Sequence, residues 1–302
     1  MQTISHYLVL IRFSHTLFAL PFALLSYAMA LKLNYMETPP IPFRWLDVVG
    51  ILLCMIFARS AAMGFNRFAD RKIDAENPRT ADRHLPSGIL SARDVLFFVL
   101  VCSLGFIAST LLFLPNVIPL FASAPVLLFL FGYSYTKRWT VCAHFWLGAA
   151  LMLAPLAAWI VARPELFPVP IPPLLLGLAV LFWTAGFDLI YATQDAEIDQ
   201  KQGLRSVPGR YGIKAAFYLS ILCHVSAVVL WGMIPVFYAP FGIIYCIGVG
   251  LIGGVLLMEH YLVLPRRNRP VDLQRINIAF FQLNVLVSLG LAAAGTLELI
   301  VR

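Results

Sequence analysis

The chain has 302 residues, of which 61% are hydrophobic and only 12% are charged. An ordinary soluble domain carries about 25% charged residues, so this composition excludes a soluble globular protein and indicates one embedded in a lipid bilayer. The net charge of +7 does not indicate nucleic-acid binding, because the basic residues are spread over segments between apolar runs and no nucleic-acid-binding motif is present.

Apolar runs long enough to cross a membrane occur nine times along the chain. A helix needs about 20 such residues to cross a hydrocarbon core of about 30 Å. We therefore predict an all-α integral membrane fold, one polytopic domain over 1–302, with spans near 8–33, 46–64, 94–114, 117–135, 141–162, 172–192, 213–233, 238–263 and 276–299. The first run carries Arg12 and His15 and has no small-residue cleavage site, so we expect a retained helix rather than a signal peptide.

The positions of the basic residues predict the orientation of these spans. If the N-terminus is inside, the outer segments keep only Lys32, Arg44, Arg163 and Arg302, which leaves eighteen of the 22 lysine and arginine residues on the inner side. Such residues accumulate on the cytoplasmic side of membrane proteins. We therefore predict a multi-pass protein of the cell membrane, the inner one in a bacterium, with a cytoplasmic N-terminus.

The second predicted helix leads into a segment with Asn66, Asp70 and Asp74, which we call the first acidic segment. If the helix continues through it, these residues are spaced four apart and share one face. Two like charges at that spacing repel by about 0.2–0.5 kcal/mol, so we expect a positive charge close to them. A basic loop with Arg79 and Arg83 follows.

The sixth predicted helix ends in a second acidic segment, which carries Asp188, Asp195 and Asp199. On a continuous α-helix their spacing of seven and four returns each carboxylate to within roughly 20° of one line. Asp188 would then lie about 16 Å deeper than Asp199, at a membrane depth where an ionisable side chain points to a functional site.

Two interpretations of the acidic residues compete. Acids beside basic loops can simply form solvated ion pairs, and we favour that interpretation for Glu76, Asp82, Glu197 and Asp272. For the four acids spaced along the two segments we favour metal binding, because two independent groups of carboxylates end helices on the same side of the membrane. Mg²⁺ takes one or two carboxylates together with water and substrate phosphate oxygens, and nearby Arg and Lys side chains suit a diphosphate.

The motifs around these residues resemble the UbiA-type intramembrane aromatic prenyltransferases over nearly the whole chain. They are Asn-x-x-x-Asp-x-x-x-Asp at 66–74, Arg-Thr-x-x-Arg-x-Leu-Pro-Ser-Gly at 79–88, Tyr-x-Lys-Arg-x-Thr at 135–140 and Asp-x-x-x-Asp at 195–199. The resemblance implies nine helices around a central cavity, with the acidic segments at the cytoplasmic ends of helices two and six. It also implies that the two segments bind a polyprenyl diphosphate through Mg²⁺, and that the prenyl group is joined to an aromatic ring by a carbon–carbon bond.

Carried over residue by residue, the resemblance assigns a role to each matching position. It implies metal binding by Asp70, Asp74, Asp195 and Asp199, diphosphate binding by Asn66, Arg67, Arg79, Lys137 and Lys201, and catalytic roles for Asp188 and Tyr191. Lys137 could equally be an ordinary anchor at the membrane surface. Asp188 could accept the ring proton, polarise the acceptor or contact the metal.

Two departures from the family pattern indicate one branch of the family. Arg67 stands where many relatives carry Asp, which removes one carboxylate from the second helix, and His84 stands where many carry Pro. Both features resemble the branch of 4-hydroxybenzoate prenyltransferase-like enzymes, which in some bacteria is linked to menaquinone made through futalosine. The implied acceptor is 4-hydroxybenzoate or a dihydroxynaphthoate-type quinone precursor, in ubiquinone or menaquinone biosynthesis.

Other functions remain open at this point. A UbiA-type enzyme could act on haem, chlorophyllide or a glycerol phosphate instead. A secondary transporter would carry acids near the bilayer midplane on broken helices, whereas most of the acids here lie where apolar runs end. The expected chemistry is ionisation of an allylic carbon–oxygen bond with stabilisation of the leaving diphosphate, in a chamber poor in water.

The charge distribution makes a first prediction about topology. Single cysteines placed in the 66–93 and 200–213 segments should react with a membrane-impermeant thiol reagent only from the cytoplasmic side. Labelling of either segment from the outside in intact cells would overturn the predicted orientation.

Overall fold

A computed structural model of the protein describes residues 18–37, 42–263, 276 and 278–302. These residues form two compact units, one over Trp45–Trp139 and the other over Leu17–Arg44 with Thr140–Arg302. Arg12, His15 and Asp272 lie outside the described residues. The single domain over 1–302 stays a prediction.

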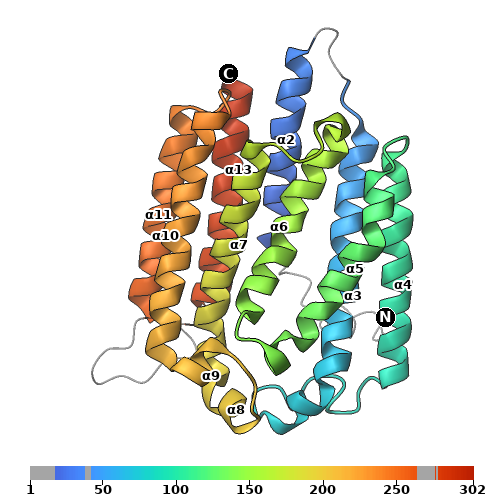
Figure 1. The fold of residues 1–302 in the computed structure, drawn as a ribbon, viewed down its shortest axis with the longest axis vertical. Coiled ribbons are helices and arrows are strands. Elements are labelled where there is room, and N and C mark those ends of the chain that lie inside the picture. The colour runs from blue at the N-terminus through green and yellow to red at the C-terminus, as the bar shows by residue number, and fades with distance from the viewer. Residues whose placement is uncertain (1–17, 38–41, 264–275, 277) are drawn as a thin grey trace. The chain divides into compact units, whose positions relative to one another are not determined.

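The first unit consists of three long helices. They are α3 Trp45–Glu76, α4 Ala92–Thr110 with the 3-10 turn η2 Leu111–Phe113, and α5 Ile118–Trp139 (Figure 1). α3 packs against α4 and α5 around a core of Ala61, Cys102, Phe106 and Leu127. A reciprocal capping box between Ser91 and Asp94 satisfies the first backbone N–H groups of α4, so the basic loop before it ends at a defined residue.

The second unit contains the remaining helices. In chain order they are α2 Leu20–Met36, α6 Ala143–Ala162, η3 Pro164–Leu166, α7 Ile171–Ala192, η4 Thr193–Asp195, α8 Ala196–Lys201, α9 Val207–Tyr211, α10 Ile213–Phe237, α11 Ile243–Val263, η5 Ala279–Leu283 and α13 Asn284–Val301. α7 packs against α6 on one side and α10 on the other (Figure 1). In the span that contains α7, 67% of the apolar stretch is buried inside the protein, against 17–39% in the other candidate spans. Protein therefore surrounds most of α7.

Eight of the nine predicted spans are confirmed. Eight helices of the described ranges are long and apolar enough to cross a membrane, and they correspond to the second to ninth predicted runs. No strand occurs in these ranges, in agreement with the all-α prediction. The first predicted run is described only from Phe18 onward, where α2 begins at Leu20, so the ninth span stays a prediction.

The sixth span is not the continuous α-helix that we predicted through Asp199. α7 ends at Ala192 and a 3-10 turn over Thr193–Asp195 precedes α8. The hydroxyl of Thr193 donates to the carbonyl of Ile190 at 2.7 Å, which favours a tighter turn at this point. A 3-10 turn advances about 120° per residue rather than 100°, so three such residues rotate Asp199 by roughly 60° from the predicted line.

A second non-α segment precedes the last helix. Ala279–Leu283 form a π-helix, and α13 starts directly after it at Asn284. Such segments contain one residue more per turn than an α-helix and often occur at functional sites. Here the segment carries Phe280 toward α7, where its ring meets Tyr191.

α6 and α7 approach each other closely at two glycines. A Cβ atom on Gly148 of α6 would clash with the backbone carbonyl oxygen of Leu181, and one on Gly177 of α7 would lie 3.1 Å from Met152 Cγ. The first neighbour is backbone and cannot move aside without shifting a helix. The absence of a side chain at Gly148 therefore determines how near the two helices lie.

This packing makes the second prediction. Gly148→Ala should lower the thermal midpoint of the purified protein, by the equivalent of about 1–3 kcal/mol, because overpacking forces the backbone to shift. Gly250→Ala is the matched control, since a Cβ there meets nothing within 4 Å and alanine is the better helix former. An unchanged midpoint for Gly148→Ala would show that α6 and α7 can separate freely.

Candidate functional site

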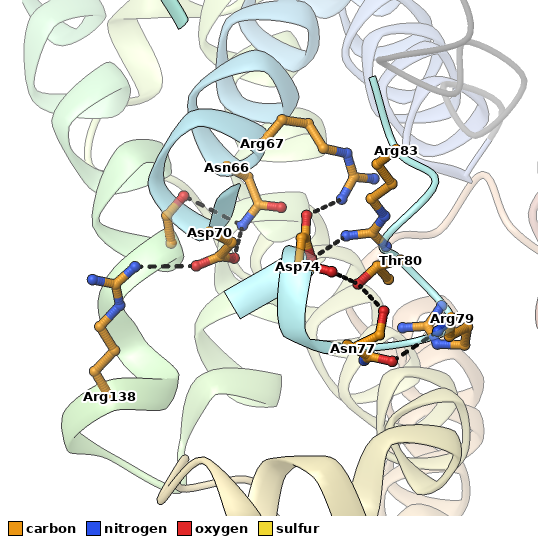
Figure 2. A network of polar contacts seen from close by, with 10 residues as sticks. Asn66, Arg67, Asp70, Asp74, Asn77, Arg79, Thr80, Arg83 and Arg138 are labelled. Carbon is orange, nitrogen blue, oxygen red and sulfur yellow. Dashed lines mark hydrogen bonds and ion pairs between the residues drawn. The ribbon is translucent and has the colours of Figure 1, made fainter. Parts of the chain in front are cut away.

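The first acidic segment lies entirely within α3, which stays helical to Glu76. Asn66, Asp70 and Asp74 therefore recur every four residues along one helix, as Figure 2 shows. The side-chain amide of Asn66 donates to Asp70 Oδ2 at 2.9 Å and lies 3.5 Å from the Ser134 hydroxyl on α5. Asn66 thus fixes one carboxylate oxygen of Asp70.

The Asp74 carboxylate lies close to two arginines. Its side chain is only 9% exposed, and its Oδ1 accepts a hydrogen bond from Arg83 Nη1 at 2.6 Å. Its Oδ2 lies 3.9 Å from Arg67 Nη1, and its backbone carbonyl accepts from the Thr80 hydroxyl at 2.9 Å. The carboxylate therefore ties the helix end to the basic loop that follows (Figure 2).

Three further basic residues belong to the ends of helices and the loop near Asp70 and Asp74. Arg138 in the last turn of α5 places Nη2 3.3 Å from Asp70 Oδ1, and the half-buried Lys137 precedes it. Arg79 is exposed, and its backbone N–H donates to Asn77 Oδ1 at 3.0 Å. Thus Arg67 and Arg138 reach the carboxylates, whereas Arg79 lies on the surface of the loop.

The second acidic segment spans the end of α7, the turn η4 and the helix α8. Asp195 and Asp199 are buried, with 8% and 4% exposure. The carbonyl oxygen of Asp199 accepts from Leu204 N at 2.8 Å, which turns the chain back after α8. Lys201, the last residue of α8, is exposed.

The short helix α9 packs directly against Asp199. Ser206 caps α9 by accepting a hydrogen bond from Gly209 N at 3.2 Å. A Cβ on Gly209 would lie 3.2 Å from Asp199 Cβ, so glycine allows the backbone of α9 to come close to the carboxylate. The approach keeps Asp199 out of solvent.

Asp188 lies deeper in α7 and has a partner that the sequence did not suggest. Its Oδ2 lies 2.6 Å from Nδ1 of His144 on α6. The Asp188 side chain keeps 12% exposure, while the His144 side chain has none. Asp188 is therefore compensated by an imidazole rather than by a basic loop residue.

Tyr191 lies one turn beyond Asp188 beside a group of aromatic rings. Its ring centroid is 4.2 Å from that of Phe280, which in turn contacts Phe187 at 5.4 Å and Phe18 at 5.7 Å. Aromatic faces attract cations and bring no nucleophile. This part of α7 thus offers an apolar and cation-tolerant wall.

The acidic residues fit a hard divalent cation. Asp74 Oδ2 and Asp199 Oδ2 are buried and have no hydrogen-bond partner among the described residues; Arg67 Nη1, 3.9 Å from Asp74 Oδ2, is an ion-pair partner beyond hydrogen-bond distance. A buried carboxylate oxygen without a hydrogen bond is stabilised by a cation that comes close to it. No three His, Cys, Asp or Glu side chains of the described ranges converge on one point. Mg²⁺ commonly takes one or two carboxylates and completes its shell with water and phosphate oxygens. Two acids in each acidic segment agree with that number of carboxylate ligands.

Three residues of the site escaped the sequence-based prediction of the site. Arg83 and Arg138, which pair with Asp74 and Asp70, stood within the quoted motifs, but spacing did not reveal which acid each one meets. His144 stood as a single histidine in an apolar run. The sequence pointed to it only indirectly, because the buried acid Asp188 on another helix requires a hydrogen-bond donor.

The chain is similar to known proteins of one family. A profile of the UbiA prenyltransferase family matches residues 19–285. A 4-hydroxybenzoate octaprenyltransferase from Saccharophagus degradans is 33% identical over 228 residues, which cover 74% of this chain and 72% of that protein. The enzyme of the same name from Nitrosomonas eutropha is 35% identical over 185 residues, which cover 59% of this chain and 60% of that enzyme.

Solved structures share the fold. The apo structure of a UbiA homologue from Aeropyrum pernix is 29% identical and superposes with a TM-score of 0.79, covering 93% of this chain and 96% of that one. A UbiA homologue from Archaeoglobus fulgidus, bound to DMAPP and Mg²⁺, has 21% identity and a TM-score of 0.70, covering 98% of this chain and 99% of that one. The second likeness concerns the fold alone.

Proposed function

Since the chain belongs to the UbiA prenyltransferase family, we propose that it transfers a polyprenyl group from a polyprenyl diphosphate to an aromatic acceptor and releases diphosphate. The acceptor is 4-hydroxybenzoate or a dihydroxynaphthoate-type quinone precursor. The observation that carries this proposal is the pair of acidic segments, each ending an apolar helix and each holding a buried carboxylate oxygen without a hydrogen-bond partner among the described residues. The curated relatives named above support an aromatic acid as acceptor.

The acidic segments bind the diphosphate end of the donor. Asp70 and Asp74 in the first segment, and Asp195 and Asp199 in the second, hold Mg²⁺. When bound, Mg²⁺ offsets the negative charge that collects on the departing diphosphate. The buried oxygens of Asp74 and Asp199 that accept no hydrogen bond among the described residues then gain a close positive partner.

The basic residues and the amide complete the diphosphate site. Arg67 lies within ion-pairing distance of Asp74, and its planar guanidinium can bind phosphate oxygens through two parallel hydrogen bonds. Lys137, Arg79 and Lys201 add positive charge from the helix ends and loops, and Asn66 orients Asp70. Donors around the leaving group stabilise the transition state by offsetting the charge that develops there.

The deeper part of α7 serves the acceptor and the prenyl cation. Phe187 and Phe280 present aromatic faces near Tyr191, and these can stabilise a cation without quenching it. Asp188 and Tyr191 are the ionisable groups of α7, so they orient the acceptor ring and take part in its deprotonation. The reaction takes place on the cytoplasmic side of a bacterial inner membrane.

The third prediction tests substrate and metal together. Purified protein in detergent should transfer a labelled farnesyl or longer prenyl group to at least one hydroxylated aromatic acid, and excess chelator should abolish the transfer until Mg²⁺ is restored. Glycerol phosphates, haem and chlorophyllide should not act as acceptors. Full turnover in chelator would contradict the role of the metal, and exclusive use of a non-aromatic acceptor would contradict the proposed reaction.

The fourth prediction separates the acidic segments from ordinary loop acids. Asp70→Asn and Asp195→Asn keep side-chain size but remove the charge that holds the metal, so kcat/KM should fall at least about a hundredfold, or roughly 2.7 kcal/mol. Asp272 and the exposed Asp82 serve as controls, and their Asn variants should stay within a few-fold of wild type. Thermal-shift profiles must match for all four variants. Near-normal transfer by the first pair would mean that these carboxylates are structural and do not hold the metal.

A further inference from the structure

The contact between His144 and Asp188 joins two buried side chains from different helices. Nδ1 of His144 lies 2.6 Å from Asp188 Oδ2, a short distance that is typical of hydrogen bonds with charged partners. His144 is 0% exposed and Asp188 9%. Both residues belong to membrane-spanning helices, where an ionisable side chain is costly and its partner is a candidate for function.

The packing of α6 on α7 holds this pair in place. Gly148 follows His144 by one helical turn, and it is there that α6 comes so close to Leu181 of α7 that a Cβ would clash with its carbonyl oxygen. A close approach supported by backbone allows little sliding between the helices. The backbones that carry His144 and Asp188 are therefore held at a fixed separation.

The hydrogen bonds of the ring indicate which nitrogen carries the proton. Nε2 of His144 is buried and has no partner in the part of the chain that the structure describes. A buried N–H without a partner is rarer than an acceptor without a donor, so Nε2 carries the lone pair and Nδ1 carries the hydrogen. Nδ1–H then donates to Asp188 Oδ2.

The two members of the pair differ in access. The carboxylate side chain keeps 12% exposure, whereas the imidazole has none. Asp188 can therefore meet a substrate, and His144 acts only through Asp188. Tyr191, three residues further along α7, lies about one helical turn from Asp188 and so on a similar face.

We propose that His144 is a positioning residue for Asp188 in the proposed prenyl transfer, and that Asp188 takes the proton that the acceptor ring releases. The allylic carbon–oxygen bond breaks and its electron pair leaves with diphosphate. The ring carbon supplies the pair for the new carbon–carbon bond, and its proton passes to the Asp188 carboxylate, which restores the aromatic ring. His144 holds one carboxylate oxygen of Asp188. The carboxylate is therefore already oriented for proton transfer before the aromatic substrate binds.

The inference rests on the proposed function, and its test uses variants that keep or remove the donor. His144→Asn can present an N–H near the position of Nδ1, whereas His144→Leu has similar bulk and no donor; His144→Met replaces the leucine variant if that one does not fold. With the acceptor that the wild type uses, kcat should fall at least about tenfold in His144→Leu, since a positioned proton acceptor contributes on the order of 10²–10⁴. In His144→Asn it should fall much less.

Two further readouts separate positioning from a structural role. An acceptor deuterated on the ring should show an isotope effect on kcat in His144→Leu that exceeds that of the wild type, because proton removal becomes slower. Adding His144→Leu to Asp188→Asn should cause little additional loss, because both act on one step. Binding of a non-hydrolysable prenyl diphosphate analogue with Mg²⁺ should be unchanged in the single variants.

Failure of the proposed prenyl transfer and failure of the role of His144 give different results. A wild type that prenylates no hydroxylated aromatic acid overturns the proposed function and the inference together. An active wild type with an unchanged isotope effect in His144→Leu, or with equal losses in the leucine and asparagine variants, overturns the role of His144 alone.

Discussion

The cost of placing carboxylates in apolar helices governs the arrangement of this protein. A carboxylate taken out of water needs positive charge or hydrogen-bond donors nearby, and three of the acids described here obtain them in different ways. Asp74 is paired with arginines of α3 and the following loop, and Asp70 with an arginine at the end of α5. Asp188, which lies deeper, is met by the imidazole of His144.

The arrangement is also incomplete, which is what a binding site requires. Oxygens of Asp74 and Asp199 remain without a hydrogen-bond partner within the described ranges, so the free protein carries part of the desolvation cost that a bound cation would relieve. Carboxylates whose charge and hydrogen bonds were already satisfied would gain little free energy from binding a metal. The arginines limit this cost, and in the proposed function they turn toward the phosphate oxygens of the donor.

Prediction from sequence succeeded where one repeating pattern determines the outcome. Long apolar runs require helices in a bilayer, so eight spans and the helical placement of Asn66, Asp70 and Asp74 could be predicted from residue type and spacing. It failed where a single side chain changes the backbone, as Thr193 does in the turn after α7. The pairing of His144 with Asp188 depends on how α6 and α7 pack at Gly148, and separation along the chain contains no information about that.

The π-helix before α13 has a consequence for how this chain can change during evolution. Residues 279–283 hold one residue more per turn than an α-helix, so losing one residue there would convert the segment to an α-helix and leave the rest of α13 in register. The same loss inside α13 would rotate everything beyond it by about 100°, and Leu291 and Glu298 would turn from protein toward lipid. Length variation among relatives of this chain should therefore collect at 279–283 and be rare in the eighteen residues that follow.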